Sequence, residues 1–157
     1  MINTVQSYAW GHTRCIPDFL NIDWPEGRPA AELWMGSHPG APSRIQLSEG
    51  AGLVDMDKWI ASAPASILGE KTHKRFGALP FLLKLLAAGK ALSIQAHPDE
   101  AAAREGFERE ERLGIPPGAP GRSYKDSRHK PEIIMALTPF TAMIGFREPR
   151  HTGRIFT

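Results

Sequence analysis

The sequence has little cysteine. Cys15 is the only cysteine among its 157 residues. An internal disulfide therefore cannot form, and a cluster of cysteines cannot hold a zinc ion. A chain of this kind is typical of a reducing compartment, so we expect a cytoplasmic protein.

Patterns typical of signal peptides and membrane segments are also lacking in this sequence. The first ten residues lack the basic-then-apolar order of a signal peptide. The most apolar stretch, residues 79–96, is interrupted by Lys84 and Lys90, which makes it unsuited to spanning a bilayer. We therefore expect no membrane partner.

Charge of one sign is not in excess either. The 19 Lys and Arg residues nearly balance the 17 Asp and Glu residues, which leaves a formal charge of +2. Such a chain lacks the excess of positive charge that binding to nucleic acid requires, so nucleic acid is not expected as a partner. The sequence also lacks the phosphate-loop, nucleophile-elbow and HExxH motifs, which excludes several common enzyme classes.

Turn-forming residues, in contrast, are abundant. The 15 glycines and 14 prolines separate short apolar runs, a pattern that favours a mainly β protein with a few helices. One helix is expected after Asp55 or Asp57, and another from an Asp99 cap to Leu113, stopped by Gly114. Strands are expected at residues 31–36, 44–47, 80–87, 91–97, 130–137 and 141–146, a flexible loop at 114–123, and an atypical tail at 147–157.

Two polar residues near the end of the apolar stretch could hold a metal. Gln95 and His97 share one face of the strand expected there, together with Ser93, because side chains alternate along a strand. A Gln-x-His pair is also typical of the solvent-facing side of a half-buried sheet. On spacing alone, that structural interpretation is favoured.

A second candidate lies at the start of the strand expected at 130–137. Lys130 and Glu132 share a face there, and a carboxylate beside a lysine can be a metal ligand next to a proton-handling or charge-stabilising group. A surface ion pair is the favoured interpretation of this pair taken alone. Gln95, His97 and Glu132 together would supply three of the four ligands that a tetrahedral zinc needs.

Several motifs in order resemble one family. Residues 124–132 (YKDSRHKPE) and 92–99 (LSIQAHPD) are similar to the two signatures of type I mannose-6-phosphate isomerases. Residues 8–11 (YAWG), 31–36 (AELWMG) and 79–84 (LPFLLK) match as well. The matches cover nearly the whole chain, and their number and order make the resemblance specific.

The resemblance implies a cupin-type jelly-roll barrel with one zinc ion, and interconversion of mannose 6-phosphate and fructose 6-phosphate. Gln95, His97 and Glu132 would be the zinc ligands, which reverses the structural interpretations above. Lys130 would be catalytic. The substrate would lie near Trp10, Ser93 and His129, although local packing is the default interpretation of Trp10 alone. The family is expected to be monomeric, cytoplasmic and part of carbohydrate metabolism.

The sequence departs from the family in three ways. Arg128 stands where the signature has asparagine, and His12 where the family usually has serine. Members of the family are much longer, and a fourth zinc ligand, a histidine, and an active-site arginine lie in the region that this chain lacks. The residues around His151 match no family motif, so His151 is not expected to replace that ligand. The alternative hypothesis is therefore a truncated, inactive cupin fragment that binds zinc or sugar phosphate, with an incomplete barrel that aggregates.

Overall fold

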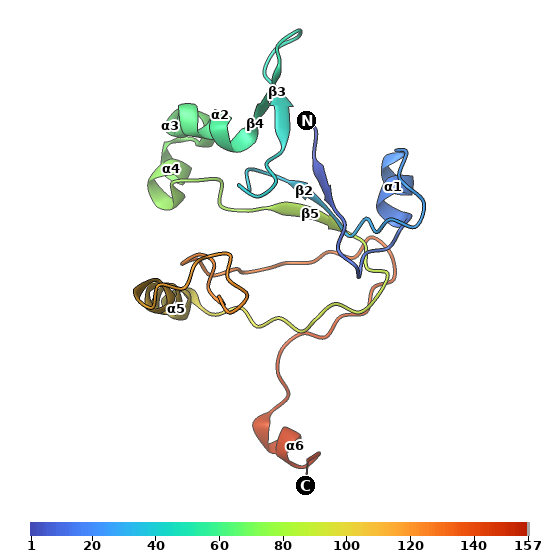
Figure 1. Cartoon of the computed structure of the whole chain (residues 1–157), viewed down its shortest axis with the longest axis vertical. Coiled ribbons are helices and arrows are strands. Elements are labelled where there is room, and N and C mark those ends of the chain that lie inside the picture. Colours follow the sequence, from blue (N-terminus) through green and yellow to red (C-terminus); the bar gives the residue numbers. More distant parts are fainter. Residues whose placement is uncertain (157) are drawn as a thin grey trace. The chain divides into compact units, whose positions relative to one another are not determined.

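The computed structural model describes residues 1–156, and its chain divides into two compact units, Met1–Ile94 and Gln95–Thr157. Figure 1 follows the chain from one terminus to the other by colour. No helix within residues 1–156 has the length and apolar character that crossing a membrane requires.

A three-stranded antiparallel sheet forms the centre of the first unit. Its strands are β1 (Thr4–Gln6), β2 (Glu32–Met35) and β5 (Leu83–Leu86), with β2 in the middle. Leu33 is aligned with Val5 on one side and with Leu85 on the other, so these three apolar side chains lie on one face. The strand predicted at residues 31–36 from the alternation of its side chains is thereby confirmed. The core consists of Ile16, Ala30 and Leu33, packed against Val5, Leu20, Trp24, Met35, Leu85 and Ala87.

A hairpin and four short helices complete the first unit. The hairpin pairs β3 (Arg44–Gln46) with β4 (Leu53–Asp55), and β3 confirms the strand predicted at 44–47. Asp55 precedes the first residue of α2 as predicted, but its carboxylate accepts from Lys58 Nζ at 2.6 Å instead of from a backbone N–H. The helices are α1 (Cys15–Leu20), α2 (Met56–Ser62), α3 (Pro64–Leu68) and α4 (Glu70–Phe76).

The second unit is organised around α5 (Glu100–Arg112), where the sequence predicted a helix. The Asp99 carboxylate accepts a hydrogen bond from the Ala102 N–H at 2.8 Å, which confirms the predicted cap. Gly114 follows the helix with a φ of +66°, a conformation that glycine adopts without steric cost. A short helix, α6 (Pro149–Gly153), lies in the tail.

The strands predicted at 91–97, 130–137 and 141–146 are absent from the structure, and residues 1–156 form no closed barrel. A strand exists only through backbone pairing, and these segments pair with no other strand of the described chain. Their apolar side chains are consequently exposed, as at Ile133 (99%) and Ile144 (87%). Helices accordingly hold more residues than strands, so the predicted mainly β content is wrong for this structure.

Close packing joins α5 to Tyr124. A Cβ atom on Gly106 would lie 2.4 Å from the Tyr124 ring, which is far inside van der Waals contact. On the same helix, the guanidinium of Arg109 lies 5.8 Å from the centre of that ring. The missing side chain at Gly106 is therefore what lets the ring pack against the helix.

We expect Gly106→Ala to destabilise the second unit by about 1–3 kcal/mol, the usual range for overpacking. The sign of this change in stability is informative, because in an isolated helix alanine is more favourable than glycine by about 1 kcal/mol. Urea unfolding followed by helical circular dichroism measures the change. Gly118→Ala is the matched control because nothing lies within 4 Å of its Cβ position. A Gly106→Ala chain as stable as the wild type would contradict the packing described.

Candidate active site

A cavity of about 670 Å³ lies within the second unit. Its walls come from residues 95–98, from Ala103 on α5, and from several residues between Ser123 and Lys130. This volume is within the range of small-molecule sites. The two segments that resembled the family signatures therefore meet around one space.

His97 and Glu132 approach each other at the candidate metal position. His97 Nε2 lies 3.3 Å from Glu132 Oε2. Two ligands bonded at about 2.0–2.1 Å to one tetrahedral ion lie about 3.3–3.4 Å apart, whereas a charge-assisted hydrogen bond is about 2.7–2.9 Å long. The observed separation thus fits the edge of a tetrahedral metal site.

Gln95 supplies the third predicted ligand. Gln95 lines the cavity together with His97, so an amide-bearing residue and an imidazole-bearing residue belong to the same lining. Within residues 1–156, no group of three or more His, Cys, Asp or Glu side chains is arranged to hold a metal ion. The donor set consists of an imidazole, a carboxylate and an amide, and these fit a zinc ion with an incomplete protein shell.

Lys130 also lines the cavity and forms an ion pair with Asp126, with 3.2 Å between Nζ and Oδ2. The Asp126 carboxylate in addition accepts the Arg128 N–H at 2.9 Å. Burial alone would raise the pKa of Asp126, but the bonds from the Arg128 N–H and Lys130 outweigh it, so the pKa lies below its ordinary value. Asp126 therefore remains a carboxylate that orients Lys130.

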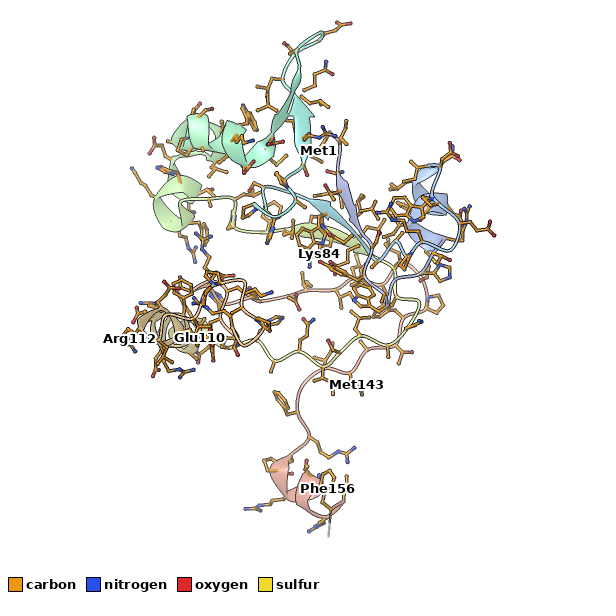
Figure 2. All side chains as sticks on the ribbon, viewed as in Figure 1. Met1, Lys84, Glu110, Arg112, Met143 and Phe156 are labelled. Carbon is orange, nitrogen blue, oxygen red and sulfur yellow. The ribbon has the colours of Figure 1, made fainter. Side chains whose placement is uncertain are left out.

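A buried ion pair holds the cavity wall onto α5. Arg122 Nε lies 3.0 Å from Glu110 Oε2, and the Arg122 side chain is fully buried. Glu110 also accepts the N–H groups of Ser123 at 3.1 Å and Tyr124 at 2.8 Å, and both of those residues line the cavity. The position of Glu110 on the helix is labelled in Figure 2. The wall is thus fixed by its backbone.

Arg122 makes further bonds that the sequence did not reveal. Its guanidinium binds the carbonyl oxygens of Tyr124, at 2.6 Å, and Ile115, and it reaches Glu111 Oε1 at 2.7 Å. The sequence predicted a flexible loop at 114–123. Arg122 gives that loop a buried anchor, and the flexibility of the rest stays a prediction.

Bonds within the same unit also shape the pKa of Glu110. Burial would raise the pKa, but the Tyr124 and Ser123 N–H groups and the charges of Arg122 and Arg109 outweigh it and lower the pKa. Glu110 is therefore held in its charged form.

The predicted substrate neighbours are distributed over both units. Trp10 lies in the first unit, stacked on Tyr8 with 5.7 Å between ring centres, and its carbonyl oxygen accepts two backbone N–H groups. Ser93 is an exposed residue of the same unit. His129 is exposed in the second unit and is not among the residues that line the cavity. Their contact with substrate stays a prediction.

One polar cluster was not predicted from the sequence. Glu32, only 7% exposed, accepts the Trp34 Nε1–H at 2.7 Å and lies 3.4 Å from Lys84 Nζ. The Lys84 ammonium also lies 5.1 Å from the centre of the Trp34 ring, and Figure 2 labels Lys84 on β5. The signal was present in the sequence, because Lys84 interrupts an apolar run and Glu32 and Trp34 are two residues apart on one strand.

Comparison with known proteins decides the family. Residues 1–149 match the family described as phosphomannose isomerase type I, catalytic domain. The chain belongs to the type I phosphomannose isomerase family. It is 47% identical over 148 residues to the mannose-6-phosphate isomerase of Escherichia coli K12, a match that covers 94% of this chain and 38% of that protein. Mannose-6-phosphate isomerase 2 of Arabidopsis thaliana is 43% identical over 168 residues, which cover 98% of this chain and 35% of the plant protein.

Solved phosphomannose isomerase structures are similar in fold. A Salmonella typhimurium mannose 6-phosphate isomerase bound to fructose 6-phosphate and zinc superposes with a TM-score of 0.75 at 43% identity. The superposition covers 82% of this chain and 32% of that one. The chain therefore spans about a third of the length of the relatives that it matches.

We expect acid to loosen the cavity wall through Glu110. A group whose folded pKa is lowered contributes stability that is present above its unfolded pKa and lost as pH falls through the folded value. Thermal unfolding of α5, followed by circular dichroism from pH 7 down to pH 3, should show a falling midpoint below the ordinary glutamate pKa of 4.5. Glu110→Gln should lower the midpoint at pH 7 and reduce this dependence on acid.

Glu108→Gln is the control, since its partner Arg112 is 3.9 Å away and both side chains are mostly exposed. Equal acid dependence in the wild type and in Glu110→Gln would contradict the role assigned to Glu110.

Proposed function

We propose that the chain carries part of the active site of a zinc-dependent isomerase that interconverts mannose 6-phosphate and fructose 6-phosphate. The observation that carries the proposal is the 3.3 Å separation between His97 Nε2 and Glu132 Oε2, in a unit whose cavity is lined by Gln95, His97 and Lys130. Support comes from the relatives, which are named mannose-6-phosphate isomerases, and from the Salmonella structure with zinc and fructose 6-phosphate.

Gln95, His97 and Glu132 would hold the zinc ion in this proposal. When bound, zinc supplies Lewis acidity that polarises sugar oxygens and stabilises negative charge on them. The carboxylate contributes one negative charge, while the imidazole and the amide are neutral ligands, so this set leaves the ion strongly electrophilic.

Lys130 would act on the charge that develops during isomerisation. The aldose–ketose conversion moves one proton from C2 to C1 and one between the two oxygens, through an enediol-type state. An ammonium group held by Asp126 at 3.2 Å can stabilise negative charge on a substrate oxygen or handle one of these protons. Trp10, Ser93 and His129 are proposed as substrate neighbours.

The wider assignment follows the family. We propose a cupin-type barrel for the catalytic domain to which this chain contributes, in a monomeric cytoplasmic protein of carbohydrate metabolism. The similarity of the chain to solved phosphomannose isomerase structures supports this fold.

A second candidate function is binding without turnover. In the part of the chain described, only His97 and Glu132 supply conventional zinc ligands, and an amide is the third donor. A metal held by so few ligands binds more weakly. The chain would then hold zinc or sugar phosphate and leave the substrate unchanged.

Zinc analysis combined with an isomerase assay tests the proposal. We expect about one zinc per chain, and formation of fructose 6-phosphate from mannose 6-phosphate that a chelator abolishes. His97→Ala and Glu132→Ala should each weaken zinc binding by more than about 100-fold, because losing a ligand costs more than losing an outer hydrogen-bond partner. His151→Ala is the control, since this tail histidine is 62% exposed.

Stoichiometric zinc with no turnover would support the second candidate function. Zinc binding that survives in both His97→Ala and Glu132→Ala would refute the metal site.

A further inference from the structure

The imidazole of His12 caps α1, the first helix of the chain. Its Nδ1 atom accepts the N–H of Arg14 at 3.0 Å and the N–H of Cys15 at 3.1 Å. Cys15 is the first residue of α1 and Arg14 precedes it, and a helix has no backbone acceptors of its own for the N–H groups at this end. His12 therefore does at this helix what a serine or an aspartate side chain usually does.

Backbone bonds hold His12 against the sheet of the first unit. Its N–H donates at 2.9 Å to the carbonyl oxygen of Ala87, which directly follows β5. Its carbonyl oxygen accepts at 3.0 Å the N–H of Ala30, shortly before β2. Ala30 is completely buried, and Ile16 on α1 is buried in the same core. The His12 ring thus links the start of α1 to a backbone that is fixed on the sheet.

This cap exists in only one protonation state of the ring. Nδ1 can accept an N–H group only while it carries no proton, which requires a neutral imidazole with its hydrogen on Nε2. In the protonated ring both nitrogens are donors, so the Arg14 and Cys15 N–H groups would face a third donor instead of an acceptor. Histidine is the side chain that ordinarily changes its charge between about pH 5 and pH 8. Acid in this range therefore removes the cap.

The helix side of the ring offers no group that would stabilise its protonated form. On α1, the Asp18 carboxylate forms an ion pair with Arg14, and the remaining titratable group is the exposed Cys15 thiol. Among residues 1–156, no carboxylate lies within ion-pair distance of the His12 imidazole. A proton on His12 would therefore gain no ion pair in exchange for the cap.

The sheet side of the ring opposes a positive charge as well. The charged residues on β2, on β5 and on the segments that join these strands to His12 are Arg28, Glu32, Lys84 and Lys90. Glu32 is the one carboxylate in this set, and it lies 3.4 Å from the Lys84 ammonium. Tyr8 is uncharged at neutral pH, because burial and the Glu32 carboxylate raise its pKa. Positive charges are thus in excess beside His12, and like charges disfavour protonation of the ring.

We infer that His12 is a pH-sensitive cap, which attaches α1 to the sheet of the first unit at neutral pH and releases the start of the helix in mild acid. Serine, which the family usually has at this position, could cap the same N–H groups throughout this range, because a hydroxyl gains no charge there. The sensitivity to acid is therefore particular to this chain. Stability that the cap contributes is present at neutral pH and lost as pH falls.

Residue-resolved NMR of the full chain at about pH 7.5 and about pH 5.5 tests the inference. At the higher pH, the His12 ring should carry no proton on Nδ1, and the Arg14 and Cys15 amides should be protected from exchange. At the lower pH, their protection factors, corrected for the intrinsic effect of pH on exchange, should fall about fivefold because a helix cap is lost. Carboxylates keep their charge over this interval, so Glu110 does not contribute to the change.

His12→Ser is the decisive variant, because serine keeps a side-chain acceptor, and its Arg14 and Cys15 amides should be equally protected at both pH values. His151→Ser is the matched control, since this tail histidine is 62% exposed, and it should keep the wild-type dependence on pH. Equal protection of the wild type at both pH values, or a dependence that persists in His12→Ser, would overturn the inference. A proton on His12 Nδ1 at about pH 7.5 would overturn it too, and that measurement needs no variant.

Discussion

The buried pair of Arg122 and Glu110 is the interaction on which the second unit depends. A guanidinium without solvent contact needs a charged partner and acceptors for its remaining N–H groups, and Arg122 finds both on α5 and in its own loop. Glu110 in turn satisfies the Ser123 and Tyr124 N–H groups. Removing Arg122 would leave the buried Glu110 charge without its guanidinium partner, and removing Glu110 would leave the Ser123 and Tyr124 N–H groups without their acceptor, so the helix and the loop stabilise each other.

The chemistry of the cavity follows from that attachment. Ser123 and Tyr124 are held by their backbones, and the signature that begins at Tyr124 continues from this fixed point through Asp126 to Glu132. The Asp126 carboxylate then accepts the Arg128 N–H and forms an ion pair with the Lys130 ammonium. The Lys130 ammonium is thereby oriented by a carboxylate of the same cavity lining. A cavity wall that is ordered before a ligand arrives lowers the entropic cost of binding.

Local signals predicted local structure well. The Asp99 cap, the stop at Gly114 and the alternation around Leu33 depend on neighbouring residues, and the structure has all three. Barrel strands depend on partners far along the chain, so alternation at 130–137 could not by itself produce a strand. Arg122 was missed for a similar reason, because nothing in a glycine- and proline-rich loop indicates that its arginine meets a glutamate twelve residues earlier. The ligand set came from the family resemblance, since the Gln-x-His spacing alone favoured a solvent-facing strand.

Amide hydrogen exchange at Ser123 and Tyr124, measured residue by residue at neutral pH, tests the central claim most directly. Both N–H groups donate to a buried carboxylate, so they should be protected from exchange as strongly as the amides in the middle of α5. In Arg122→Met, both amides should lose this protection together. Exchange of these two amides at the rate of an unstructured loop in the wild-type chain would show that the cavity wall is not attached to the helix, and would contradict the account.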